Sequence, residues 1–206
     1  MDYIRDPSAI YARSFEMIRA EADMSRFPEN ARGIATRVIH SCGMIEIVDD
    51  LFITDDFVVS ATSALAAHNP ILVDVEMLRH GIIPRFLPKD VDVICTLNDP
   101  RARDIGLAKS ITRSAAAVEL WAENLAGSIV VIGNAPTALF RLLELIDEGT
   151  AKPAAIVGMP VGFVGAAESK EELINNSRGI PFASIRGRKG GSAMASSVIN
   201  ALTDRS

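Results

Sequence analysis

The segment 129–148 reads IVVIGNAPTALFRLLELIDE and carries the pattern that decides the fold. Four aliphatic residues, Ile129–Ile132, are followed by a turn at Gly133 and then by a helical pattern that Pro136 opens. Proline is favoured in the first turn of a helix, where its missing N–H costs nothing. A strand that is apolar along its whole length is typical of a parallel sheet covered by helices on both faces. The segment therefore predicts a strand–loop–helix unit of an α/β protein.

Similar apolar runs recur along the chain. They predict further strands at 71–75, 91–95, 154–157 and 182–185. The spacing of apolar residues predicts helices at about 11–22, 29–43, 103–125, 136–148, 168–177 and 192–203. We therefore expect a three-layer α/β/α sandwich with a mainly parallel sheet of about five strands. No linker or repeat divides the chain, so a single domain over residues 1–206 is expected.

Length and composition argue against several classes of protein. The chain has 206 residues, a net charge of −5 and 49% hydrophobic residues. A chain of this size buries roughly 70% of the surface that its unfolded form exposes, so it needs neither disulfides nor a metal to hold a core. An acidic balance without a basic run argues against nucleic-acid binding. Since the sequence has no secretory signal and no apolar run near the ~20 residues that span a bilayer, we expect a cytoplasmic protein away from membranes.

Common cofactor motifs do not match this sequence. The order Gly-Lys-Ser/Thr of a phosphate-binding P-loop does not occur, and the glycines of 158–165 depart from the dinucleotide-binding spacing. The three histidines lack metal-ligand spacing. Two isolated cysteines, Cys42 and Cys95, fit a reducing compartment. We therefore expect neither a cofactor nor a metal.

Two loops stand where an open parallel sheet binds its ligands, at the carboxyl ends of the strands. The loop 186–191 contributes Arg186, Arg188 and Lys189 and leads into a helix with Ser192 as its expected N-cap. Cations beside a helix N-terminus suit a carboxylate or a phosphate. The loop 133–137 is expected to add N–H donors near Thr137.

A third candidate is the pair Arg37 and His40. Three residues apart on a helix, they share a face, so an anion binder would stand beside a group that moves protons near neutral pH. The alternative is a histidine satisfied at a helix end beside a surface arginine. Cys42 is either a nucleophile paired with His40 or a buried thiol, and the spacing of two residues favours the thiol.

Five segments together resemble one family. They read HSCGM at 40–44, TRSAAA at 112–117, IGNAPTAL at 132–139, GMPVGF at 158–163 and GRKGGS at 187–192. In this order they resemble the precorrin-8X methylmutases of cobalamin biosynthesis, and the resemblance covers about Tyr11 to Leu202. One small departure is Ser41, where many members have Ala.

The resemblance implies an isomerase that moves a methyl group from C-11 to C-12 of precorrin-8X and gives hydrogenobyrinate, without a consumed cofactor. The family reaction is regarded as an acid-assisted 1,5-sigmatropic shift, in which a histidine at the position of His40 gives and recovers a proton. Ser14, Arg37, Arg113 and Thr137 are carried over as substrate contacts. The resemblance also implies a homodimer with sites near the subunit interface, and handover to neighbouring enzymes of the pathway.

The sequence leaves three alternatives to this function open. The first is the same reaction on cobalt-precorrin-8 in place of metal-free precorrin-8X, which we favour, because both branches share these motifs. A carrier that binds a corrinoid intermediate without converting it is an alternative from another class. An unrelated enzyme that binds a phosphate ligand at 186–192 is the third.

Overall fold

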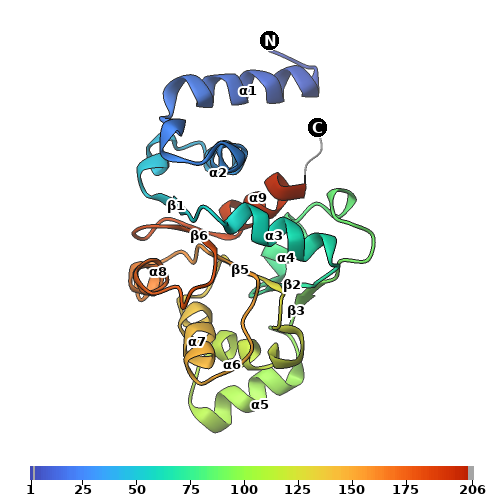
Figure 1. Ribbon diagram of the computed structural model, residues 1–206, viewed down its shortest axis with the longest axis vertical. Coiled ribbons are helices and arrows are strands. Elements are labelled where there is room, and N and C mark those ends of the chain that lie inside the picture. The colour runs from blue at the N-terminus through green and yellow to red at the C-terminus, as the bar shows by residue number, and fades with distance from the viewer. Residues whose placement is uncertain (2, 204–206) are drawn as a thin grey trace.

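The computed structural model describes residues 1 and 3–203 and is built around one sheet of six strands (Figure 1). The strands are β1 (Leu51–Ile53), β2 (Ile71–Val73), β3 (Val93–Cys95), β4 (Ile129–Ile132), β5 (Ala155–Gly158) and β6 (Phe182–Ile185). Their order is β1-β6-β5-β4-β2-β3, and all neighbours are parallel except β1 with β6. The mainly parallel sheet predicted from the sequence is therefore confirmed, with β1 as an additional antiparallel edge strand.

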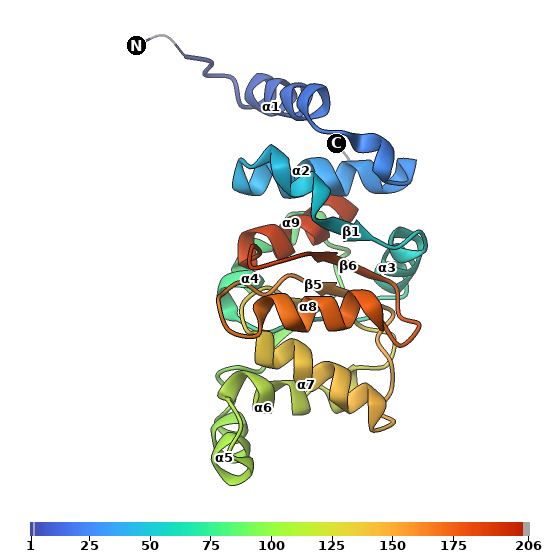
Figure 2. The ribbon, with the colours of Figure 1, turned by 90° about the vertical axis from the view of Figure 1, so that its left-hand side faces the viewer.

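Helices cover both faces of the sheet (Figure 2). The α-helices are α1 (Pro7–Glu21), α2 (Arg32–Cys42), α3 (Phe57–Ala66), α4 (Glu76–Gly81), α5 (Pro100–Lys109), α6 (Arg113–Glu119), α7 (Pro136–Asp147), α8 (Ala166–Asn175) and α9 (Ser192–Thr203). Short 3₁₀ turns are η1 (Met24–Arg26), η2 (Glu29–Ala31), η3 (Ile45–Asp49), η4 (Pro84–Phe86) and η5 (Ala122–Asn124). Within the described residues, no helix has both the length and the apolar character needed to cross a membrane.

Side chains of the central strands alternate between two hydrophobic cores. Val131 belongs to the core that the sheet shares with α2, α3, α4 and α9. Its neighbours Val130 and Ile132 belong to the core shared with α6, α7 and α8. All three are fully buried, and burial of such a side chain contributes about 1.5–3 kcal/mol. Burial on both faces explains why the apolar runs identified the strands.

The predicted helix 103–125 is wrong as a single element. Ser110 has a left-handed backbone, with φ of 54°, and ends α5. Thr112 then caps α6, because its hydroxyl accepts the Ala115 N–H at 3.2 Å. The apolar spacing continues across the break, but the local capping chemistry divides the segment into two helices.

Helices α1 and α2 extend the molecule beyond α9. In Figure 2, α2 lies on α9, and α1 lies on α2 at the greatest distance from the sheet. Helix α1 begins at Pro7, earlier than the predicted start near residue 11, and the Asp6 carboxylate caps the helix by accepting the Ala9 N–H at 2.8 Å. Ile18 is buried, while Tyr11 remains 51% exposed. The apolar face of α1 is therefore only partly covered by its own chain.

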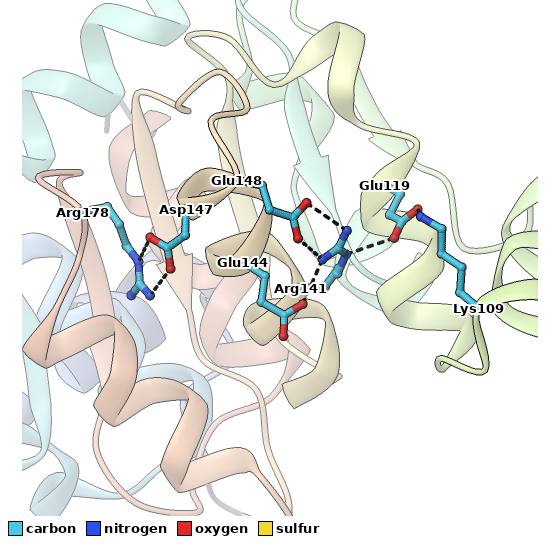
Figure 3. A network of polar contacts seen from close by, with 7 residues as sticks. All are labelled: Lys109, Glu119, Arg141, Glu144, Asp147, Glu148 and Arg178. Atoms are coloured by element: carbon cyan, nitrogen blue, oxygen red, sulfur yellow. Dashed lines mark hydrogen bonds and ion pairs between the residues drawn. The ribbon is translucent and has the colours of Figure 1, made fainter.

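On the opposite side of the sheet, an ion-pair network fixes α6 against α7 (Figure 3). Arg141 contacts Glu119 at 3.0 Å, Glu144 at 3.0 Å and Glu148 at 2.9 Å, and Lys109 contacts Glu119 at 2.6 Å. The Arg141 side chain is only 16% exposed, so water screens its pairs less than ordinary surface pairs. These contacts join the C-terminal end of α6 to the middle of α7.

Candidate active site

The candidate site begins where α1 crosses the last turn of α2. His40 lies in that turn, which ends at Gly43 with a left-handed φ of 69°. The hydroxyl oxygen of Ser14, on α1, is 2.8 Å from Nδ1 of His40. The ring centroids of Tyr11 and Phe15 lie 5.4 and 5.3 Å from that of His40. One hydrogen bond and two aromatic neighbours therefore hold the half-buried imidazole in one orientation.

The surroundings of His40 favour the neutral ring. Burial lowers the pKa of His40 below its ordinary value, and the nearby Arg37 cation lowers this pKa further. When the Ser14 hydroxyl donates to Nδ1, the neutral ring carries its proton on Nε2. His40 then offers a hydrogen-bond donor on the side away from Ser14. A lowered pKa also makes the protonated ring a stronger acid.

A titration of the His40 ring by NMR tests this electrostatic arrangement. We expect a midpoint below pH 6.5 in the unaltered protein and a higher midpoint in Arg37→Met, because the variant removes a cation that disfavours the imidazolium. Arg19→Met is the control, since Arg19 and Arg37 both lie by the ring of Phe15, at 6.0 and 5.7 Å from its centroid, but of the two only Arg37 lowers the pKa of His40. A wild-type midpoint at or above 6.5, or no upward movement in Arg37→Met, would contradict this arrangement.

Two open cavities meet at Arg37 and Phe15. One, of about 520 Å³, is lined by Phe15, Arg19, Met24, Arg32, Gly33, Thr36, Arg37 and Ala201. The other, of about 590 Å³, is lined by Ser8, Tyr11, Ala12, Phe15, Arg37, Ile83, Arg85 and Phe86. Both combine aromatic or aliphatic walls with arginines. This composition suits a flat apolar ligand that carries carboxylates at its edge. Sequence reasoning missed Arg85, which no motif marks.

The surroundings of the half-buried Cys42 favour a structural thiol over a nucleophile. Its Sγ lies 3.4 Å from the carbonyl oxygens of Val38 and Ile39, to which the thiol donates within its own helix. Burial raises the pKa of the Cys42 thiol. A protonated thiol bonded to its own backbone is a poor nucleophile.

The loop 186–191 holds its three cations in different environments. Arg186 pairs with Glu171 at 2.7 Å, and Lys189 pairs with Glu46 at 3.2 Å. Arg188 is exposed and lies over the ring of Phe163, 5.3 Å from its centroid, without an ion pair to any described residue. Arg188 is therefore the cation of this loop that is best placed for an outside anion.

The expected N-cap at Ser192 is wrong by one position. Helix α9 begins at Ser192 itself, and the carbonyl of the preceding Gly191 accepts the Ala195 N–H at 3.0 Å. The Gly191 N–H donates to the Met159 carbonyl at 2.8 Å. That backbone donor is therefore already used within the protein.

The donors expected in the loop 133–137 are also in use. The carboxylate of Asp74, which follows β2, accepts the N–H groups of Gly133, Asn134 and Ala135 at 3.0, 3.0 and 2.8 Å. Asp74 is only 2% exposed, and burial raises the pKa of its carboxyl, although these hydrogen bonds oppose the rise. A protein carboxylate thus takes the place that sequence reasoning gave to a ligand.

Asp74→Asn tests this internal anion site. An amide nitrogen replaces one acceptor oxygen, so at least one buried N–H faces another donor. We expect the free energy of unfolding to fall by about 2–3 kcal/mol, measured by urea denaturation. Asp92→Asn serves as the control because Asp92 is exposed on a neighbouring segment. Equal midpoints for both variants would contradict the role of Asp74.

Arg113 and Thr137 lie apart from His40. Both are exposed at the N-terminal ends of α6 and α7, and the Thr137 hydroxyl lies 2.8 Å from that of Thr112. These helices pack on one face of the sheet, whereas α1 and α2 lie beyond the other (Figure 2). The structure thus brings Ser14, Arg37 and His40 together and leaves Arg113 and Thr137 separate within one chain.

Comparison with known proteins places the chain in a family. The family model described as precorrin-8X methylmutase matches residues 9–205. A precorrin-8X methylmutase from Sinorhizobium sp is 57% identical, covering 98% of this chain and 96% of the relative. One from Pseudomonas aeruginosa is 52% identical, covering 98% and 97%. A cobalt-precorrin-8 methylmutase from Salmonella typhimurium is 39% identical, covering 98% and 97%.

A solved structure agrees with these matches. The crystal structure of precorrin-8X methylmutase from Thermus thermophilus superimposes with a TM-score of 0.85 at 35% identity, covering 95% of this chain and 94% of that one. The chain therefore belongs to the precorrin-8X methylmutase family, and it is an isomerase of cobalamin biosynthesis.

Proposed function

We propose that the protein converts metal-free precorrin-8X to hydrogenobyrinate by moving a methyl group from C-11 to C-12. The observation that carries the proposal is the Ser14–His40 hydrogen bond of 2.8 Å beside the two cavities that meet at Arg37. The preference for a metal-free substrate is supported by the relatives. Those named for precorrin-8X are 57% and 52% identical, against 39% for the cobalt-precorrin-8 relative from Salmonella typhimurium.

The proposed chemistry requires little of the protein beyond binding and one proton. The methyl bond at C-11 breaks as the bond at C-12 forms, so the atoms balance without a co-reactant. His40 donates a proton or a hydrogen bond to a ring nitrogen, makes the π-system ready to accept the methyl group, and takes the proton back afterwards. Ser14 fixes the orientation of the imidazole.

The cations are proposed to bind the carboxylates at the edge of the macrocycle. Arg37 stands between the two cavities beside His40 and is suited to a bidentate contact. Arg188 is the exposed cation of the loop 186–191 that forms no ion pair with a described residue. Arg186 and Lys189 already pair with Glu171 and Glu46, so we assign them to shaping the local field rather than to direct contact.

We further propose a homodimer in which Arg113 and Thr137 serve the pocket of the partner subunit. Exposed apolar side chains along α1 and the residues before it support an interface there; they are Tyr3, Ile4, Ile10, Tyr11 and Met17. Mixed assembly tests the shared site. If His40→Ala and Arg113→Ala are each inactive but regain turnover when refolded together, the two residues act across the interface. A monomer by light scattering would contradict the proposal.

Two substrates in parallel distinguish the candidate functions. We expect rapid spectral conversion of metal-free precorrin-8X and slow or no conversion of cobalt-precorrin-8. Conversion of the cobalt compound alone would assign the chain to the cobalt-containing branch. Tight binding of both compounds with no conversion of either in single-turnover mixing would favour a carrier over an enzyme.

A further inference from the structure

A buried lysine lies directly beneath the loop 186–191. Lys170, on α8, has a relative exposure of 0%. Its Nζ donates to the main-chain carbonyl of Lys189 at 2.5 Å. Burial lowers the pKa of Lys170 to about 8, while the nearby negative charge of Asp50 opposes that shift. Lysine is almost never fully buried without a partner, because removing an ammonium from water is costly.

The contact of Lys170 belongs to a set of hydrogen bonds that hold the loop from inside. The Arg188 carbonyl accepts the Gly162 N–H at 3.2 Å, and the Gly191 N–H donates to the Met159 carbonyl at 2.8 Å. Backbone hydrogen bonds thus fix the loop at Arg188 and at Gly191. Between them, the Lys170 side chain of α8 binds the Lys189 carbonyl. With the backbone fixed at these points, the exposed Arg188 side chain lies over Phe163.

We infer that Lys170 is a positioning residue that holds the loop 186–191 so that Arg188 meets a substrate carboxylate, an inference that rests on the proposed function. Without the ammonium, the Lys189 carbonyl loses its buried donor and the loop samples other conformations. Arg188 then occupies its binding orientation for less of the time. Binding weakens, while the proton transfer at His40, which belongs to other elements, continues at its usual rate.

The test compares Lys170→Met with Lys170→Gln. Methionine keeps the length and removes the donor, whereas glutamine keeps a neutral donor. Lys152→Met is a matched control, because Lys152 is exposed and its Nζ also donates to a main-chain carbonyl, that of Arg178, at 2.6 Å. For Lys170→Met we expect KM and the product Kd to rise about 10-fold, with kcat unchanged within about twofold. For Lys170→Gln, KM and the product Kd should lie between those of Lys170→Met and those of the unaltered protein. For Lys152→Met, both should match the unaltered protein.

A double-mutant cycle shows whether Lys170 acts through Arg188. In an Arg188→Ala background, Lys170→Met should raise KM little further, because the cation it positions has gone. Additive effects of the two substitutions would overturn the inference.

Hydrogen exchange of the loop amides gives a readout that needs no substrate. In Lys170→Met we expect faster exchange in the loop 186–191 than in Lys152→Met, with the amides of β4 and β5 unaffected. Unchanged loop exchange would overturn the inference even if KM rose. If the loop loosens but Arg188→Ala alone leaves KM unaltered, the carboxylate contact of the proposed function is wrong, and Lys170 has no role in binding.

Discussion

His40→Ala should lower the turnover of precorrin-8X by about 10²–10⁴-fold, the range that general acid–base groups typically contribute. The substitution removes the ring whose Nδ1 lies 2.8 Å from the Ser14 hydroxyl and so removes the proposed proton donor. His40 is half-buried at the surface of the core rather than inside it, so the fold should persist. Initial rates from the absorption spectrum, with the circular dichroism spectrum of each protein, give the measurement.

Binding and a second histidine provide the controls for His40→Ala. The affinity for hydrogenobyrinate should change little, because the cations that meet its carboxylates remain. His80→Ala, on α4, should keep full turnover, since its side chain is 81% exposed. Turnover in His40→Ala within a few-fold of the unaltered protein would remove His40 from the reaction.

Gly190→Ala should be the most damaging single-methyl addition in the loop 186–191. A Cβ at this position would clash with the carbonyl oxygen of Met159 and lie 2.8 Å from that of Pro160. Both atoms belong to the backbone, so neither moves aside as a flexible side chain would. We expect a loss of about 3 kcal/mol in the free energy of unfolding, a fall in Tm of about 6–12 °C and weaker substrate binding.

Gly187→Ala is the matched control in the same loop. Gly187 has a left-handed φ of 77°, but a Cβ there would meet nothing within 4 Å. The substitution should lower the free energy of unfolding by about 1–2 kcal/mol, because alanine disfavours a left-handed backbone. A Tm for Gly190→Ala equal to or above that of Gly187→Ala would contradict the close approach of the loop to Met159.

The sequence predicted the central strands well because they are apolar on both faces, as the burial of Val130 and Val131 explains. It missed β1, which has three residues at the sheet edge and no pattern of its own. It also missed α3 and α4, and it joined α5 to α6. The break between these helices depends on Ser110, which adopts a left-handed backbone although it is not a glycine. The sequence pattern does not indicate such a conformation at a serine.

The candidate site was predicted less completely, for tertiary reasons. Helical spacing placed Arg37 beside His40, but Ser14 is 26 residues from His40, and only the packing of α1 on α2 brings their side chains together. Asp74, at the end of a neighbouring strand, accepts the N–H groups of the loop 133–135. These partners are 59 to 61 residues away along the chain. Lys170 lies in an ordinary-looking polar helix, so sequence alone does not reveal that it is buried.

The most direct test of the central claim follows the migrating methyl group itself. Metal-free precorrin-8X carrying ¹³C in its C-11 methyl group is mixed with excess protein for a single turnover and examined by NMR. We expect the label to move to C-12 of the same molecule, with no exchange into unlabelled substrate added at the same time. Bound substrate whose label stays at C-11, or label found on the protein or on the unlabelled molecules, would contradict an intramolecular shift at this site.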